Sequence, residues 1–476
     1  MRHLTGFSNN TGTAPSLIFS NLDLWHLIWP LLVEQLLQIT LGMADIIMVS
    51  TLGEASVSGV SLVDQINILI VQIFAALATG GAVVCSQYIG RKKTDMASRT
   101  AMQLLYVTTT IALVLLVTGT LFHKGILQTV FGNVEPDVMR VSRRYFLITL
   151  LALPGIAVYN AAAAIFRAQG NSGISMKIAV LVNIINIGGN AILIYGFHWG
   201  VEGVAVPTLV SRFAAAIVLF IFLYGTKNNG TEKNRICIKG LFRFHVDFRL
   251  IARILKIGIP SGLENSTFQI GKVLVLSLIA SYGTGAIAAN AAANTLASLE
   301  VLPGSAIGIA MLTVVGQCMG ARCYDQAGYY TKKMMAFAYA GFVILNVPFL
   351  LLSYRIISFY GMSEETTRLG WYMTLIHGLC GIFIWAPSFS LPNALRAAGD
   401  AAFTMIVSIV SMWSVRVGMS FVFKATGIFG LVALLGLPES FGAVGVWISM
   451  ILDWIVRSLF FVTRFARGKW KTKNVI

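Results

Sequence analysis

Two carboxylates and an amide lie along one stripe of an apolar segment near the start of the chain. Glu34, Gln38 and Asp45 are separated by four and seven residues, so a helix would place all three on one face. A charge inside a membrane costs at least ~2.5 kcal/mol and usually faces a cavity or a partner. A carboxylate in such a place can take up a proton or coordinate a cation. We interpret Asp45, and also Glu34, as candidate cation- or proton-coupling residues; a neutral or salt-bridged carboxyl that fixes helix packing is the alternative.

Three asparagines follow a similar stripe further along the chain. Asn183, Asn186 and Asn190 are spaced at i, i+3 and i+7 in an apolar segment. Amides in such a helix either hydrogen-bond to a neighbouring helix or line a polar cavity. Both interpretations fit the spacing, and we keep both.

The second half of the chain carries a comparable set of polar residues. Asn265, Gln269 and Lys272 share one helical face, with Glu264 at its edge. Glu264 could take part in ion coupling, or it could form a simple ion pair with Lys272. Asp453 and Arg457 are four residues apart and are expected to pair with each other. The residues that we expect to line a substrate cavity are Gln38, Gln65, Asn265, Gln269, Lys272 and Asn294.

These polar residues sit in an internal repeat. One set of residues recurs 230 positions later, and Glu34 thereby corresponds to Glu264. Repeats in a membrane protein are typical of transporters whose site lies between the halves. The matching pairs are Pro30 and Pro260, Glu34 and Glu264, Gly53 and Gly283, Gln87 and Gln317, Gly90 and Gly320, and, 229 apart, Arg167 and Arg396.

Composition places the repeat in a membrane. Of the 476 residues, 57% are hydrophobic and 11% are charged. A membrane-crossing helix needs roughly 20 apolar residues, and helices satisfy their own backbone hydrogen bonds in lipid. The fold class that we predict is an all-α polytopic membrane protein. Twelve spans are expected, at about 24–50, 60–87, 100–121, 143–167, 172–196, 202–225, 250–282, 288–318, 331–353, 369–395, 400–424 and 442–465.

Prolines should kink two of these spans. Pro154 lies inside the fourth span, and Pro387 and Pro392 lie inside the tenth. Proline removes a backbone donor and clashes with the preceding turn, so a bend is expected at each site.

The basic residues predict the orientation and the domain limits. Of 35 Lys and Arg, 24 fall in loops on one side and seven on the other, which places both termini in the cytoplasm. The same bias explains the net charge of +16 without nucleic acid as a partner. We predict an N-lobe at 1–226, a cytoplasmic linker at 227–249 and a C-lobe at 250–476. Because each lobe has six spans, the lobes should be related by a pseudo-two-fold axis along the membrane normal, with a cleft between them.

Enzyme and cofactor signals are weak. The glycine-containing stretch from Gly283 to Ala288 falls between two spans rather than after a strand, so it does not indicate nucleotide binding. No phosphate-binding loop of the G-x-x-x-x-G-K-[ST] type occurs, and the six histidines lack metal-ligand spacing. The five cysteines are scattered and imply neither disulfides nor a metal cage. We therefore expect no enzyme activity and no cofactor.

Several motifs in order resemble a known family. The P-x-x-x-E opening is followed by MADIIMVSTLG, QYIGR, FRAQGN, NIIN and GVEGVAVPT, and parts of this order return in the second half. The chain resembles the MATE family, the multidrug and toxic compound extrusion transporters, over nearly its whole length. The resemblance implies two six-helix lobes around a V-shaped cavity. It also implies export of organic, often cationic, compounds in exchange for protons or sodium ions.

The resemblance carries over to individual positions only in part. The family's aspartate of the first span falls on Asp45, whereas the aspartate of the fifth span is replaced by Asn190. The C-lobe glutamate and aspartate of the sodium-coupled branch fall on Phe268 and Trp385. A carboxyl buried beside Asn183 and Asn190 would favour its protonated form, which suits proton exchange. The same oxygens could instead hold Na⁺ at Asp45, Asn183 and Asn190, so the coupling ion stays open.

The sequence thus predicts a secondary-active multidrug efflux antiporter that works by alternating access. We expect a monomer in the plasma membrane whose partners are small organic substrates, H⁺ or Na⁺, and lipid. The first alternative is a lipid-linked oligosaccharide flippase of the same superfamily, which needs a large, strongly cationic cavity. A membrane-embedded enzyme or a receptor is a further alternative; the former lacks a visible catalytic constellation, and the latter does not explain the repeat.

Overall fold

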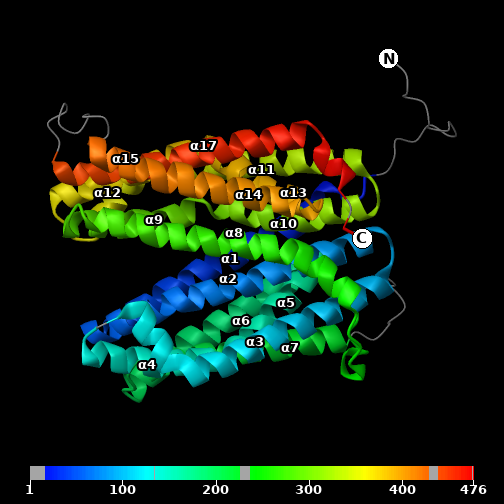
Figure 1. Cartoon of the computed structure of the whole chain (residues 1–476), viewed down its shortest axis with the longest axis horizontal. Coiled ribbons are helices and arrows are strands. Elements are labelled where there is room, and N and C mark those ends of the chain that lie inside the picture. The colour runs from blue at the N-terminus through cyan, green and yellow to red at the C-terminus, as the bar shows by residue number, and fades with distance from the viewer. Residues whose placement is uncertain (1–16, 133, 226–235, 428–437, 474) are drawn as a thin grey trace.

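The computed structural model describes residues 17–132, 134–225, 236–427, 438–473 and 475–476, and all regular structure in these ranges is helical (Figure 1). This confirms the predicted all-α class. The first half of the chain forms α1 (Asn21–Ser50), α2 (Glu54–Gly90), α3 (Thr94–Phe131), α4 (Pro136–Leu151), α5 (Leu153–Ala168), α6 (Ser172–Ala191), the π-helical turn η1 (Ile192–Gly196) and α7 (Glu202–Tyr224).

The second half repeats this arrangement with more interruptions. It forms a short 3₁₀ turn η2 (Leu241–Arg243), α8 (Phe248–Ala280), α9 (Thr284–Glu300), α10 (Leu302–Gly320), α11 (Tyr324–Ser358), α12 (Glu364–Trp385), η3 (Ala386–Ser390), α13 (Leu391–Ala397), α14 (Ala401–Ser411), η4 (Met412–Val417), α15 (Gly418–Thr426), η5 (Glu439–Ala443), α17 (Val444–Ala466) and η6 (Lys469–Thr472).

These elements join into the twelve predicted spans. Within the described residues, ten helices are long and apolar enough to cross a membrane, and the bent pair of α4 and α5 makes an eleventh. The remaining predicted span coincides with α8, a helix of 33 residues that is not among these eleven and that carries five charged side chains.

The predicted proline kinks have visible counterparts. Helices α4 and α5 meet at an angle of 46°, two residues before Pro154. In the tenth span the chain between α12 and α13 adopts a π-helical turn that includes Pro387. A π turn adds a residue to the helical repeat and commonly marks a functional position.

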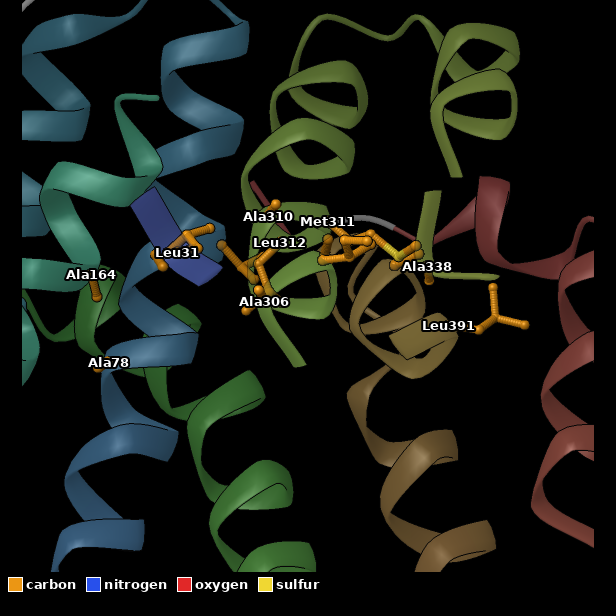
Figure 2. Close-up of a cluster of buried hydrophobic side chains, with 14 of the residues drawn as sticks. Leu31, Ala78, Ala164, Ala306, Ala310, Met311, Leu312, Ala338 and Leu391 are labelled. Atoms are coloured by element: carbon orange, nitrogen blue, oxygen red, sulfur yellow. The ribbon is translucent and has the colours of Figure 1, made fainter. Parts of the chain in front are cut away.

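The helices gather into two bundles that share a buried interface. Figure 1 places α1 to α7 on one side and α8 to α17 on the other, with α2 beside α8 and α1 beside α10 at the boundary. One hydrophobic cluster crosses this boundary, and Figure 2 shows its members Leu31, Ala78, Ala164 and Ala306 together with others from α10, α11 and α13. A second cluster lies wholly within the first bundle, around Phe74, Phe146 and Val204.

One end of the boundary is held by a contact that occurs twice. The Gln87 side chain donates to the carbonyl of Ala397 at 2.8 Å, and the Gln317 side chain donates to the carbonyl of Ala168, also at 2.8 Å. Gln87 corresponds to Gln317 in the repeat, and Ala168 to Ala397. The two bonds are therefore related by a pseudo-two-fold operation. We call Gln87, Gly90, Gln317 and Gly320, with the two accepting carbonyls, the clasp.

Glycine makes this approach possible. A Cβ on Gly320 would lie 1.9 Å from the carbonyl oxygen of Gln87, and one on Gly90 would lie 2.0 Å from that of Gln317. Both obstructions are backbone atoms, which cannot rotate away. The clasp thus exists because two glycines let the ends of α2 and α10 touch.

We predict that Gly320→Ala destabilises this arrangement by at least ~1–3 kcal/mol, because overpacking against a backbone forces the two helices apart. The measurement is thermal unfolding of the purified protein, followed by tryptophan fluorescence. Gly188→Ala is the control, since a Cβ added to Gly188 would meet nothing within 4 Å. Equal melting temperatures for the two variants would contradict the packing of the clasp.

Candidate functional site

Asp45 lies against the asparagine stripe of the fifth span. The Asn190 side chain donates to Asp45 Oδ1 at 2.6 Å and to Asn186 Oδ1 at 3.2 Å. Asn190 is fully buried, and its own Oδ1 has no hydrogen-bond partner in the described residues. Helices α1 and α6, which carry these groups, pack side by side. The geometry gives one titratable oxygen pair surrounded by amides, which can bind a proton or a small cation.

Asn183 is separated from this group. Its amide nitrogen donates to the carbonyl of Ala179 at 2.9 Å, and its side chain lines a cavity. The seven residues between Asn183 and Asn190 correspond to a rise of ~10.5 Å along the helix. In this structure Asp45 is therefore grouped with Asn190 and Asn186, while Asn183 lies apart from them.

Sequence reasoning gave no role to a further carboxylate in the same bundle. Asp64 on α2 accepts hydrogen bonds from the Tyr145 hydroxyl at 3.3 Å and from the Asn67 amide at 3.4 Å. Tyr145 comes from α4, so its contact with Asp64 is invisible to helical periodicity. Asp64 gives the first bundle a second carboxylate held by neutral donors.

Glu34 instead forms an ion pair with Arg167. Arg167 Nη1 lies 2.9 Å from Glu34 Oε1, and the Ser175 hydroxyl donates to Glu34 Oε2 at 2.7 Å. Glu34 is 1% exposed, and its partners come from α5 and α6. This geometry favours the packing alternative over ion coupling for Glu34.

The repeat builds the equivalent pair in the second bundle. Arg396 Nη2 lies 2.7 Å from Glu264 Oε2, and the Ser408 hydroxyl donates to Glu264 Oε1 at 2.6 Å. Arg457 adds a weaker contact to Glu264 Oε1 at 3.4 Å. Ser408 lies one helical turn beyond the position that corresponds to Ser175. A buried carboxylate that faces two guanidinium groups is held in its charged form.

Two predicted ion pairs are wrong. Lys272 makes no ion pair with Glu264 or with any other acid in the described ranges. Asp453 does not pair with Arg457; its carboxylate accepts from the Ser411 hydroxyl, while Arg457 turns to Glu264. Glu264 pairs with Arg396 from another helix rather than with Lys272, and Asp453 bonds to Ser411 from another helix rather than to Arg457.

Two polar cavities lie between the helices. The larger, of about 660 Å³, is lined from α1, α2, α5, α6, α7 and α10, and it includes Gln38 and Asn183. The smaller, of about 280 Å³, is lined from α2, α8, α9, η4 and α17. Four of the predicted substrate residues lie on the smaller cavity: Gln65, Gln269, Lys272 and Asn294. Asn265 lines neither cavity, but its amide donates to Gln72 Oε1 at 3.1 Å and so connects α8 to α2.

A buried pair in the second bundle has no signal in the sequence. The His377 ring hydrogen-bonds to Glu300, and both side chains are at least nine-tenths buried. Trp447 and Trp454 contact the His377 ring edge-on. The two partners are 77 residues apart, so only the packing of α9 against α12 reveals them.

A helical protein with many apolar spans, a duplicated bundle and polar cavities between the helices is typical of a transporter. This chain belongs to the MatE family, whose profile matches residues 30–192 and 260–422. The two matched segments begin 230 residues apart, which is the offset of the repeat. The resemblance noted from the motifs is thus confirmed.

Known relatives agree over most of the chain. It is 26% identical over 463 residues to "Uncharacterized transporter YisQ" of Bacillus subtilis (strain 168), covering 95% of this chain and 96% of the relative. It is 24% identical to "Probable multidrug resistance protein NorM" of Thermotoga maritima, covering 95% of this chain and 94% of that protein. The fold matches an outward-facing MATE family transporter of the MOP superfamily with a TM-score of 0.81 at 18% identity, covering 94% and 96% of the two chains.

We predict that Glu264→Gln lowers stability by about 3–5 kcal/mol, because it leaves Arg396 and Arg457 buried without their carboxylate. Lys272→Met should change stability little, since its removal leaves no buried carboxylate without an ion-pair partner. Thermal unfolding of the two single variants and of the double variant forms the test. A large coupling energy between positions 264 and 272 would contradict the observed pairing.

Proposed function

We propose that this transporter is a secondary-active exporter of small organic compounds, driven by H⁺ or Na⁺ that binds at Asp45. The observation that carries the proposal is the hydrogen bond between Asp45 and Asn190, in a polar group inside an apolar bundle. The relatives called multidrug resistance proteins support organic substrates. The larger cavity falls in the usual range of ~300–1,000 Å³ for small-molecule sites.

The proposed cycle is an exchange between two arrangements of the lobes. The ion enters from outside, binds Asp45, and favours the state in which substrate is released outward. The clasp and the Asp45 group lie toward opposite ends of the bundle, so the clasp can close one entrance while the other admits the ion. We place the clasp at the cytoplasmic side, because Arg91, Lys92 and Arg322 follow it directly in sequence.

The lobes in this proposal are residues 1–226 and 250–476, with 227–249 as a cytoplasmic linker. The described part of the linker contacts α3 of the first lobe. The Gln103 side-chain amide donates to the His245 carbonyl at 2.7 Å, and Gln103 Oε1 accepts from the Asp247 backbone N–H at 3.0 Å. Such an attachment would let the second lobe move from the start of α8 onward. Both termini are cytoplasmic and the working unit is a monomer in the plasma membrane.

The chemistry of the site is compatible with either H⁺ or Na⁺ as the coupling ion. Asn186 and Asn190 offer amide oxygens but cannot titrate, so Asp45 is the one group there that can exchange a proton. With a proton the site needs only that carboxyl; with Na⁺ it needs several oxygens at once. The two mechanisms are separable by replacing one ion gradient with the other.

We predict that Asp45→Asn abolishes ion-driven efflux, because the neutral amide can neither release a proton nor attract a cation. The measurement is uptake into proteoliposomes under an imposed pH gradient, and separately under an imposed Na⁺ gradient. Asp137→Asn is the matched control, since Asp137 is exposed and, among the described residues, forms its ion pair with Arg140 at the surface. Wild-type transport by Asp45→Asn would refute the coupling role, and loss of transport in the control would show that the assay is not selective.

A further inference from the structure

Both cavities are lined by basic side chains. No aspartate or glutamate within the described ranges lines either cavity, whereas four basic residues do: Arg167, Arg212, Lys272 and Arg416. An exporter specialised for organic cations would need the opposite charge, so the charge of the cavity wall bears directly on the substrate.

The larger cavity is close to neutral. Arg167 is held by Glu34 at 2.9 Å, which cancels its charge locally. Arg212 lies over the Tyr159 ring, with 5.7 Å between its guanidinium carbon and the ring centre. Asp45 belongs to the same bundle and offsets Arg212 when it is ionised.

The smaller cavity contains two cations that form no salt bridge within the described residues. Lys272 lines the cavity, and no ion pair to it occurs among the residues that the structure places. Arg416 is 8% exposed, lies 5.3 Å from the Phe268 ring centre, and leaves its Nε without a hydrogen bond. Asp453, the acid on neighbouring α17, is bonded to Ser411 and acts on the Arg416 charge without an ion pair in the described chain, whereas Lys272 has no such acid.

Two cations without salt bridges inside an apolar helical bundle are costly and therefore point to a function. We propose that the smaller cavity binds the carboxylate or sulfonate group of an amphipathic organic anion, with Lys272 and Arg416 as its counter-charges. This inference rests on the proposed export function and names its substrate class. It replaces, for this chain, the organic cations that the family resemblance suggested.

The rest of the cavity fits such a molecule. Trp447 offers an aromatic face whose indole N–H is already used, because it donates to Asn290 Oδ1 at 3.2 Å. Gln65 and Gln269 supply amide donors close to the cations, while the remaining wall is mainly aliphatic. Gln65 belongs to α2 of the first bundle and Gln269 to α8 of the second, so a bound anion would contact both lobes.

Size selects among anions. A volume of about 280 Å³ accommodates an aromatic ring system with one charged group. A lipid-linked pyrophosphate is larger than this cavity, and its negative charge exceeds the positive charge of Lys272 and Arg416. A bare inorganic anion would leave the apolar wall unfilled.

The test compares two probes of matched shape and opposite charge: 1-naphthalenesulfonate and 1-naphthyltrimethylammonium. Equilibrium dialysis against the purified full-length protein should give at least about tenfold tighter binding of the sulfonate. Lys272→Gln should weaken sulfonate binding about tenfold and leave ammonium binding unchanged. Lys272→Arg should retain most of the sulfonate affinity.

The experiment also includes a control variant and two competing anions. Lys424→Gln removes a cation that binds Ser281 at 2.6 Å outside the cavity, so it should not change sulfonate binding. Sodium sulfate and farnesyl pyrophosphate at equal concentration should displace little sulfonate. The proposal is overturned if the ammonium binds as tightly as the sulfonate, if Lys272→Gln binds sulfonate like the wild type, or if either competitor displaces it fully.

The binding assay is independent of ion coupling. Asp137→Asn should bind the sulfonate with wild-type affinity, since Asp137 is exposed and does not line this cavity. If ion gradients drive only the ammonium through proteoliposomes, the export function stands and the anion inference fails. If the sulfonate binds through Lys272 but no gradient moves either probe, the anion site stands and the export function fails.

Discussion

The structure depends on the need to partner every carboxylate buried between apolar helices. Glu34 and Glu264 take arginines from a helix later in their own repeat, and Asp45 takes an amide from Asn190. An uncompensated charge in such a place would cost several kcal/mol, so these contacts determine how the helices rotate against one another. Once the acids are satisfied in this way, Arg212, Lys272 and Arg416 face the two cavities without a salt bridge in the described residues.

The ion pairs and the clasp share one short segment in each lobe. Arg167 holds Glu34 through its side chain, while its carbonyl accepts from Thr313 of the other lobe at 2.9 Å. The next residue, Ala168, accepts from Gln317. Packing within a lobe and contact between lobes are thus built on adjacent residues. A movement that opens the clasp must therefore shift the segment Arg167–Ala168, and the Arg167 side chain is held inside its own bundle by Glu34. Because this segment cannot move apart from its bundle, each lobe is expected to move as a rigid body.

The proposed ion site lies in the first lobe, whereas the cations of the proposed anion site belong to the second. Asp45 lies between α1 and α6, whereas Lys272 and Arg416 lie on α8 and η4. Coupling would then pass through the lobe interface rather than through competition for one group. Helix α2 is placed to transmit it, because its Gln72 bonds to Asn265 of α8 and its Gly90 belongs to the clasp. This arrangement would allow an ion and an anionic substrate to be bound on opposite sides of one hinge.

Sequence alone determined the repeat, the spans and the polar stripes, because each depends on local composition, a constant offset or the 3.6-residue period. It also singled out Asp45 and Asn190, although their contact joins separate helices. The partner of Glu264 needed the tertiary structure: Lys272 lies eight residues, or ~12 Å of helix rise, away, while Arg396 comes from another helix. Periodicity specifies which face of a helix is polar but not which neighbour meets that face, so the buried pairs and the uncompensated charge of the cavity were decided by helix packing.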